Sequence, residues 1–332
     1  DPALAARIAV VAARIVFGNP TRGRYPAAER LATGALAASR ASGPPEVACQ
    51  ALEVLGRCAR RRDLAEAHAL YEQGLAIAEE HHLVAERIGL LYHLGGHDGI
   101  RSADPRRLLA ALDQAVEAGA VVSALNIELE LAVVRICRGE YDAARAATER
   151  CEETARRLKL THTRLIALGE RVIVAAHQGR PAEAGPLLQR FRDLGGEDDD
   201  FSAAVRGFGL AIGHLRGDDL PGALAEVRRA AADEARRPAS YLSFVAGPAL
   251  FLDVLAGAAG EPECAAMAAT AHAQAGWNRQ FLPLARAVLC GRDGRAAEAE
   301  AAFARFLRAS RPYPLIHRLG PRLIARAPAD PL

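Results

Sequence analysis

Apolar residues recur at helical spacing along the whole chain, and short polar turns interrupt them. The repeating unit is an apolar helix, a turn of Gly with acidic or Arg residues, and a second helix with a small residue in its first turn. Clear copies of the turn occupy residues 139–144, 179–184 and 294–299, and looser copies occupy 62–67 and 217–223. Because β-branched residues never gather into alternating runs, the pattern predicts an all-α protein of antiparallel helical hairpins.

The small residue in each second helix shows the period of the repeat. These anchor residues are Ala67, Ala144, Ala184, Ala223 and Ala299. Their successive separations are 77, 40, 39 and 76 residues. The two wide gaps are about double the narrow ones, and each contains a further helix start, at Pro105 and at Pro262, because Pro is favoured at the first helical position. We therefore expect about seven or eight hairpins in one repeat domain over residues 1–332.

Each part of the turn has a physical role. A glycine such as Gly139 can adopt the left-handed backbone that ends the first helix. Ala67 lets two helices approach closely, and Tyr71, four residues later, lies on the same helix face. This spacing resembles the tetratricopeptide repeat (TPR), although the period exceeds that family's roughly 34 residues and the Trp and Tyr of its first helix are absent. The predicted fold class is therefore a TPR-like superhelix.

Composition and charge narrow the class of partner. The formal net charge is +2, so we expect no direct nucleic-acid contact by this segment. The most apolar stretch, residues 239–260, includes Asp253, which is costly in lipid, and we interpret it as a core helix with a kink at Pro248. We predict no membrane contact. The six cysteines lack CxxC or zinc-like spacing, which indicates reduced, buried thiols in a cytoplasmic protein.

No catalytic motif is recognisable. Lys159 is the only lysine, and no Gly-rich loop precedes it, whereas a P-loop requires GxxxxGK[ST]. No Ser–His–Asp or Cys–His arrangement can be assembled from the spacing of these residues. We predict a protein that is not an enzyme and that uses no cofactor.

The Ala- and Arg-rich hairpins, the segment 55–67 and the segment 290–325 resemble the helical region of large ATP-binding LuxR-type transcriptional regulators of actinobacteria, which have a MalT-like architecture. In that family a P-loop ATPase domain precedes the helical region and a helix-turn-helix domain follows it. The resemblance implies a regulatory protein-interaction region that couples those two domains. Because Asp1 stands where Met normally begins a chain, we expect an excised segment.

Two other functions stay open. The resemblance also implies an inducer or small-molecule sensor, since a relative binds an oligosaccharide through its helical region. An unrelated TPR-like scaffold is the third hypothesis, because a repeat fold does not dictate function.

The candidate binding residues are Tyr92, His93 and Trp277. Superhelical repeats bind partners along a concave surface, and these three side chains are candidates for lining such a groove. The partner would be a protein, another domain of the same regulator or a small-molecule inducer.

The histidines suggest metal binding less strongly. His93 and His97 stand four residues apart, with Asp98 next, and two His at that spacing on one helix face can share a metal ion. Gly95 and Gly96 lie between them, and we expect these glycines to break the helix. No third ligand has suitable spacing, so we predict no metal site.

Overall fold

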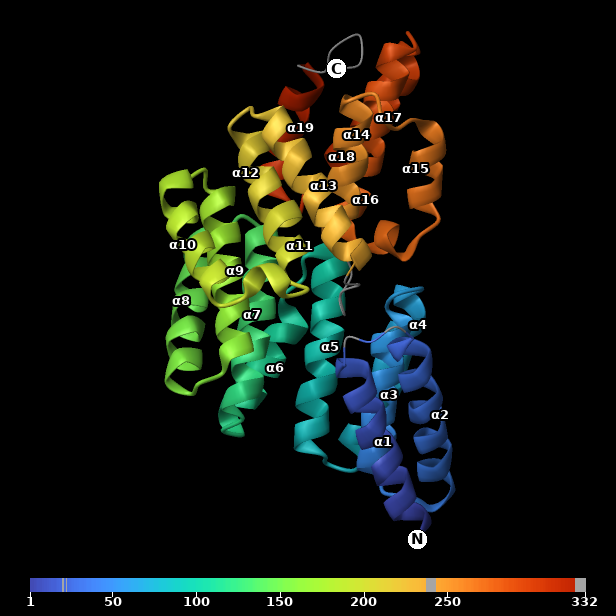
Figure 1. Cartoon of the computed structure of the whole chain (residues 1–332). Coiled ribbons are helices and arrows are strands. Elements are labelled where there is room, and N and C mark those ends of the chain that lie inside the picture. The colour runs from blue at the N-terminus through green and yellow to red at the C-terminus, as the bar shows by residue number, and fades with distance from the viewer. Residues whose placement is uncertain (20, 22, 237–242, 326–332) are drawn as a thin grey trace. The chain divides into compact units, whose positions relative to one another are not determined.

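The computed structural model describes residues 1–19, 21, 23–236 and 243–325, and every regular element in these residues is helical (Figure 1). The α-helices are α1 (Pro2–Gly18), α2 (Arg24–Ser42), α3 (Pro45–Ala59), α4 (Leu64–Glu80), α5 (Val84–Ser102), α6 (Arg106–Glu117), α7 (Val121–Cys137), α8 (Tyr141–Arg157), α9 (Thr161–His177), α10 (Pro181–Asp193), α11 (Ser202–Ala204), α12 (Ala211–Arg216), α13 (Leu220–Arg236), α14 (Ala246–Leu255), α15 (Glu261–Ala268), α16 (Gly276–Arg279), α17 (Phe281–Arg292), α18 (Ala296–Ala309) and α19 (Pro314–Ala325). Two 3₁₀ turns, η1 (Gly196–Asp198) and η3 (Ala271–Gln274), and one π-helix, η2 (Val205–Leu210), complete the chain. The predicted all-α repeat fold is confirmed.

The repeat period has a simple structural origin. Helices α7, α8 and α9 each contain 17 residues, and three residues join each helix to the next. A residue with left-handed backbone lies in each turn, at Gly119, Gly139, Lys159 and Gly179, with φ of 65°, 75°, 57° and 69°. These positions are 20 residues apart, so two helices and two turns make the period of 40 that the sequence predicts.

The anchor alanines lie where helices approach one another. Four of the five are buried, and Ala299 is half-buried. Tyr71, four residues after Ala67, is fully buried, and its ring lies over Gly56, where an added Cβ would be 2.3 Å from Tyr71 Cε1. Ala67 and Tyr71 therefore both lie in the core of unit 1, on the shared helix face that the spacing predicts.

The chain forms two compact units. Unit 1 comprises residues 1–98 and 105–127, and unit 2 comprises residues 99–104 and 128–332. In unit 1, α1 packs against α2 and α3, α2 against α3, and α3 against α4 (Figure 1). The prediction of a single repeat domain over residues 1–332 stays a prediction.

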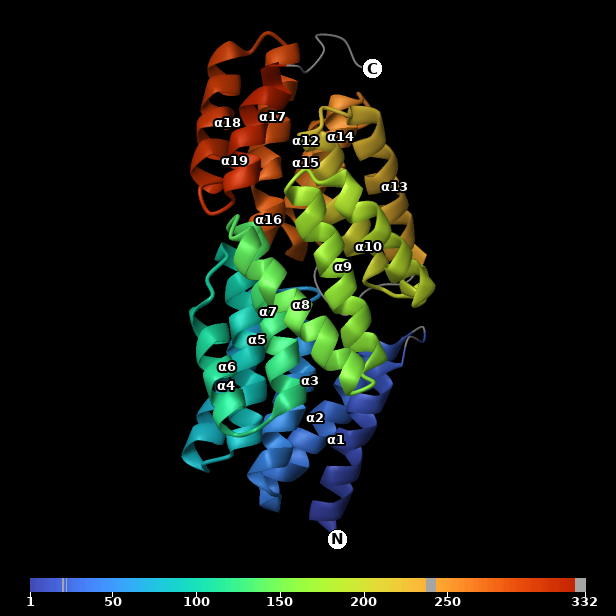
Figure 2. The same ribbon diagram turned by 90° about the vertical axis from the view of Figure 1, so that its left-hand side faces the viewer.

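Unit 2 brings distant parts of its own sequence together. Helix α8 packs on α9, α9 on α10 and η2, and α17 on α18 and α19 (Figure 2). The turn at Gly139 meets Pro314, since a Cβ on Gly139 would be 3.8 Å from the proline ring. Arg322 and Asp218, 104 residues apart, form an ion pair of 2.9 Å. The last helix of the unit therefore returns to contact earlier turns.

The apolar stretch 239–260 differs from expectation in one detail. Its first residues, 239–242, lie outside the described residues, and the helix begins at Ala246. Pro248 thus lies in the first turn of α14, where its missing N–H removes no helical hydrogen bond, and the predicted kink is wrong. None of the helices in the described ranges combines the length and apolarity that a membrane span requires. All six cysteines are buried, as predicted.

Candidate functional site

Helix α5 is unbroken, which corrects one prediction from sequence. It runs from Val84 to Ser102 straight through Gly95 and Gly96. Gly95 serves close packing instead of ending the helix, because a Cβ there would be 2.7 Å from the backbone nitrogen of Leu108 at the start of α6. The histidines of α5 therefore stand on a continuous helix face that points toward α3 and α4 partners in unit 1.

The two histidines of α5 have different partners. His93 Nε2 lies 3.2 Å from Glu53 Oε1 on α3. His97 Nδ1 lies 3.3 Å from His68 Nδ1 on α4. The spacing along the chain favours His93 as the neighbour of His97, but the packing of α4 on α5 places His68 beside His97 instead.

His93 belongs to a closed ion-pair network. Glu53 also binds Arg14 at 2.6 Å and Arg57 at 3.7 Å. Burial raises the pKa of Glu53, but the His93 hydrogen bond and the neighbouring cations outweigh it and lower the pKa to about 2. The His93 ring stacks on Tyr71 with centroids 5.2 Å apart, and burial lowers the pKa of His93. His93 is thus mostly buried and held in place by Glu53 and Tyr71.

Tyr92 lies beside this network. Its ring centroid is 4.9 Å from that of His93, and its side chain is half-buried. Of the three candidate groove residues, Tyr92 and His93 are therefore brought together in unit 1.

Next to this network lies a cluster of metal-ligating side chains, which we name the His–Asp centre and define as His68, His97 and Asp98. One ligand atom from each lies within 4.8 Å of the others. His97 is fully buried, whereas His68 and Asp98 are partly exposed, with side-chain exposures of 29 % and 25 %. Glu72 and Arg107 border the centre, and Arg107 binds Glu72 at 2.8 Å and Asp98 at 3.4 Å.

Trp277 lies in unit 2, inside the core. It is 3 % exposed, and its indole N–H donates to the carbonyl of Phe244 at 2.9 Å. Its ring makes edge contacts with Phe208, Phe281 and Tyr313 at centroid distances of 4.6, 5.7 and 5.9 Å. The prediction that Trp277 lines an open groove is corrected: its large apolar ring gains more by filling the core than by facing water.

The surroundings of Trp277 form an aromatic cluster, which comprises Tyr141, His177, Phe208, Phe244, Trp277, Phe281 and Tyr313. Its polar atoms are incompletely satisfied. Among the described residues, the hydroxyls of Tyr141 and Tyr313 and the Nδ1 of His177 are buried without a hydrogen-bond partner. His177 Nε2 lies 2.5 Å from the Phe208 carbonyl oxygen, yet burial lowers the pKa of His177 to about 4.

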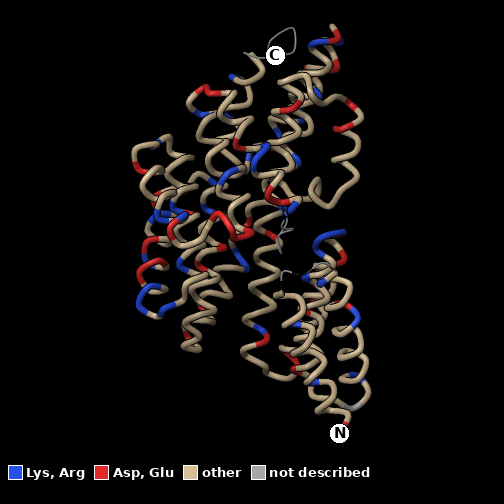
Figure 3. Tube along the Cα trace, viewed as in Figure 1, with Lys and Arg blue, Asp and Glu red and all other residues tan. Residues whose placement is uncertain are grey.

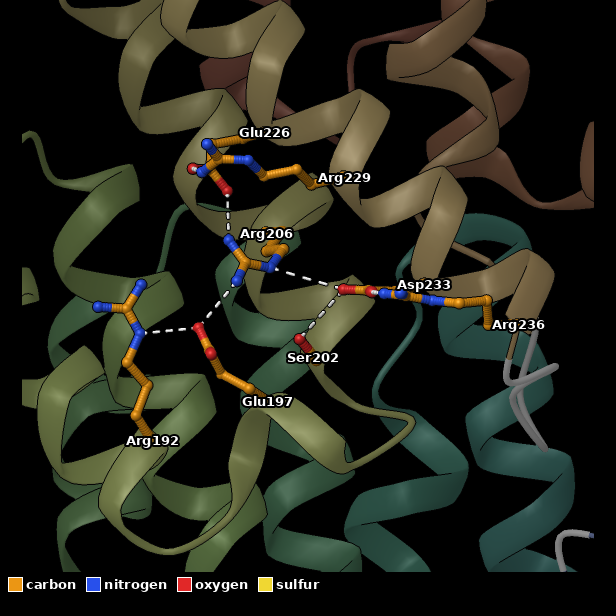
Figure 4. A network of polar contacts seen from close by, with 8 residues as sticks. All are labelled: Arg192, Glu197, Ser202, Arg206, Glu226, Arg229, Asp233 and Arg236. Carbon is orange, nitrogen blue, oxygen red and sulfur yellow. Dashed lines mark hydrogen bonds and ion pairs between the residues drawn. The ribbon is translucent and has the colours of Figure 1, made fainter.

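A second polar cluster surrounds Arg206 on the π-helix η2 (Figure 4). The guanidinium donates to Glu226 and Glu197, each at 2.9 Å, and its Nε lies 3.6 Å from Asp233. Ser202 Oγ donates to the same Asp233 oxygen at 3.4 Å. π-Helical segments often occur at functional sites, but here three carboxylates surround the guanidinium of Arg206. This network therefore ties η1, η2 and α13 together.

Comparison with known proteins does not assign this chain to a family. The sequence matches no protein-family model, and no curated protein is significantly similar to it. The structure defines the class of protein, an all-α helical-repeat protein.

Proposed function

We propose that this chain is a non-catalytic interaction module that binds an apolar helix of a protein partner through α1. The observation that carries the proposal is a row of exposed aliphatic side chains. Leu4, Ile8, Val11 and Ile15 are 55 %, 61 %, 52 % and 66 % exposed. Their spacing of four, three and four residues places them on one face of the helix. We name these four residues the α1 stripe.

The opposite face of α1 already packs in unit 1. Ala6, Val10, Ala13 and Phe17 are buried in the core with α2 and α3. A helix that is apolar on two faces is normally covered on both. The α1 stripe has the composition of an internal packing surface.

The chemistry of the α1 stripe favours an apolar partner. Its flanking cations, Arg7 and Arg14, bind Glu46 at 3.5 Å and Glu53 at 2.6 Å on α3, so they serve unit 1 itself. Fully burying one Leu or Ile is worth about 1.5–3 kcal/mol, so covering four half-exposed side chains favours association. The spacing matches the seam of two packed helices.

The resemblance of the Ala- and Arg-rich hairpins to LuxR-type regulators supports a proposal for the identity of the partner. We propose that the partner is another domain of a LuxR-type transcriptional regulator in the cytoplasm, and that this region couples its ATPase and DNA-binding domains. Acidic and basic positions are interspersed along the helices of each unit (Figure 3), in agreement with an apolar contact rather than an electrostatic one.

Site-specific photo-crosslinking in cells tests the proposal. A photoreactive residue at position 8 should form a crosslink to an amphipathic helix of another domain or protein, identified by mass spectrometry. The matched control is the exposed, polar position of Arg30 on α2, which should give no such product. A crosslink only to a second copy of this chain, or equal products at positions 8 and 30, would overturn the proposal.

A second function, small-molecule sensing, is favoured by one observation in unit 2. Three buried polar atoms in the aromatic cluster have no hydrogen-bond partner among the described residues, and a polar ligand would satisfy them. A thermal-shift screen of sugars and other small metabolites tests this function, since a ligand of the folded state raises the melting temperature. A genuine ligand should also change the fluorescence of Trp277. A library without such a compound would remove this function.

A further inference from the structure

We infer that the His–Asp centre binds one divalent transition-metal ion of the Zn²⁺ class, which links α4 to α5. Two imidazoles and one carboxylate converge there, with one ligand atom of each within 4.8 Å of the others. His68 comes from α4, and His97 and Asp98 come from the unbroken last turns of α5.

The spacing of the two imidazoles suits a tetrahedral ion. With Zn–N bonds of about 2.0–2.1 Å, two nitrogen ligands lie about 3.3 Å apart. The distance between His68 Nδ1 and His97 Nδ1 is 3.3 Å. A hydrogen bond between the rings has a similar length, so the experiment below separates these two arrangements.

A neighbouring carboxylate favours the tautomer that a metal needs. Glu72, one turn after His68 on α4, has its Oε1 3.3 Å from His68 Nε2. An acceptor there holds the ring proton on Nε2 and leaves the Nδ1 lone pair directed toward His97. Ligating histidines in metal sites commonly have such a carboxylate behind them.

The charges around the centre are compatible with a cation. Glu72 and Asp98 are acidic, and Arg107 supplies the opposing charge by binding both carboxylates, at 2.8 Å and 3.4 Å. The Arg107 Nε lies 3.4 Å from Asp98 Oδ2, and a carboxylate can accept at both oxygens. Asp98 can therefore pair with Arg107 and still place one ligand atom within 4.8 Å of those of the two histidines.

The donor set selects the kind of ion. Imidazole nitrogens suit Zn²⁺, Co²⁺, Ni²⁺ and Cu²⁺, whereas Mg²⁺ and Ca²⁺ prefer oxygen ligands alone. The fully buried His97 places one side of the ion inside the helix pair, and the partly exposed His68 provides the approach from solvent. His93 is not part of the set, because its Nε2 faces Glu53.

The test compares metal binding by the whole chain and by two variants after treatment with a chelator. Isothermal titration with Zn²⁺ should give one tight equivalent, and Co²⁺ should give the visible absorption of a tetrahedral complex. His68→Gln should weaken binding at least tenfold, because one of three ligands is lost. His81→Gln is the matched control, since His81 is an exposed histidine at the end of the same helix, and it should bind as the parent chain does.

Circular dichroism of the metal-free proteins distinguishes the loss of a metal ligand from the loss of folding. His68 is partly exposed, so His68→Gln should keep its helical spectrum, and Asp98→Asn provides a second ligand variant at a partly exposed position. Zn²⁺ should raise the melting temperature of the parent chain and of His81→Gln, but not of either ligand variant. No binding by the parent chain, or equal binding by His68→Gln, would show that the two rings share only a hydrogen bond and would overturn the inference.

Discussion

Units 1 and 2 are both built from helical hairpins, but different side chains fill their cores. The sequence has 16 aromatic residues, of which 12 lie in unit 2 and four in unit 1. Unit 2 gathers seven rings, with that of His177 among them, into the aromatic cluster around Trp277. The core of unit 1 consists mainly of Ala, Val and Leu, with Phe17 and Tyr71 as its large rings.

Exposed apolar side chains show the opposite distribution and are concentrated in unit 1. Of the ten large hydrophobic side chains that are exposed in the described residues, nine lie in unit 1 and only Leu158 lies in unit 2. Unit 2 uses its apolar side chains for contacts among its own distant segments, such as those of Trp277 with Phe208 and Tyr313. Hairpins of the same kind can therefore differ in composition: the large apolar side chains of unit 2 are mostly buried, whereas unit 1 exposes nine of them in the described residues.

One buried carboxylate in each unit illustrates a further difference. Glu53 and His93 of unit 1 satisfy each other, with two arginines nearby. In unit 2, Glu170 is 2 % exposed and has one carboxylate oxygen without a partner in the described part of the chain, and burial, with the charge of Glu130, raises its pKa well above the ordinary value. The buried carboxylate of unit 1 is therefore paired with His93 and two arginines, whereas one oxygen of the buried carboxylate Glu170 in unit 2 is unpaired in the described residues.

The largest effect is expected at the centre of the aromatic cluster. Trp277→Ala should lower the free energy of unfolding by about 3–5 kcal/mol, because it leaves a cavity and an unpaired Phe244 carbonyl. Leu158→Ala, at an exposed position in the same unit, should change it by less than about 0.5 kcal/mol. Urea unfolding followed by circular dichroism measures both. Equal losses would mean that Trp277 does not organise unit 2.

His177 should make unit 2 sensitive to mild acid. Burial, with Arg216 nearby, lowers its pKa to about 4, so the folded state resists a proton that the unfolded state accepts near pH 6.5. This stability is present above pH 6.5 and is lost as the pH falls toward 4, with a total of about 3 kcal/mol. His177→Phe should flatten this slope in urea unfolding between pH 6.5 and 4.5. An unchanged slope would contradict the assignment to His177.

Features set by residues close together in the sequence could be predicted, whereas contacts between distant residues could not. The repeat period, the left-handed glycines and the buried alanines follow from local rules, and they are confirmed at Gly139, Gly179 and Ala144. The position of Trp277 depends on rings such as Phe208 and Tyr313, which lie 69 and 36 residues away along the chain. No local pattern brings those rings together.

The His–Asp centre shows the same limit. The spacing of His93 and His97 is visible in sequence, but Gly95 and Gly96 suggest a break between them. The structure uses Gly95 for close contact with Leu108, so the helix continues. His68 is 29 residues before His97, and only the register of α4 on α5 brings the two rings together. A search for His residues on consecutive predicted helices is the signal that would have found this pair.

A pair of glycines tests how tightly the core of unit 1 is packed without large rings. Gly56→Ala should destabilise by about 1–3 kcal/mol, because the new Cβ would lie 2.3 Å from the buried ring of Tyr71. Gly34→Ala on α2 meets nothing within 4 Å and should stabilise the helix by about 0.5–1 kcal/mol. Thermal unfolding of the two variants gives opposite shifts if the Tyr71–Gly56 contact is essential. Shifts of one sign would indicate that Tyr71 moves freely.

The smallest effect on stability is expected on the α1 stripe, and it sharpens the comparison most directly. Ile8→Gln should change the free energy of unfolding by less than about 0.5 kcal/mol, because Ile8 is 61 % exposed. Val10→Ala, two residues further and 1 % exposed, should cost about 1–2 kcal/mol, because it empties part of the core with α2 and α3. Urea unfolding of both variants separates the two faces of α1. If Ile8→Gln lowered the free energy of unfolding as much as Val10→Ala, the α1 stripe would stabilise unit 1 itself. The contrast between the buried apolar side chains of unit 2 and the exposed ones of unit 1 would then fail.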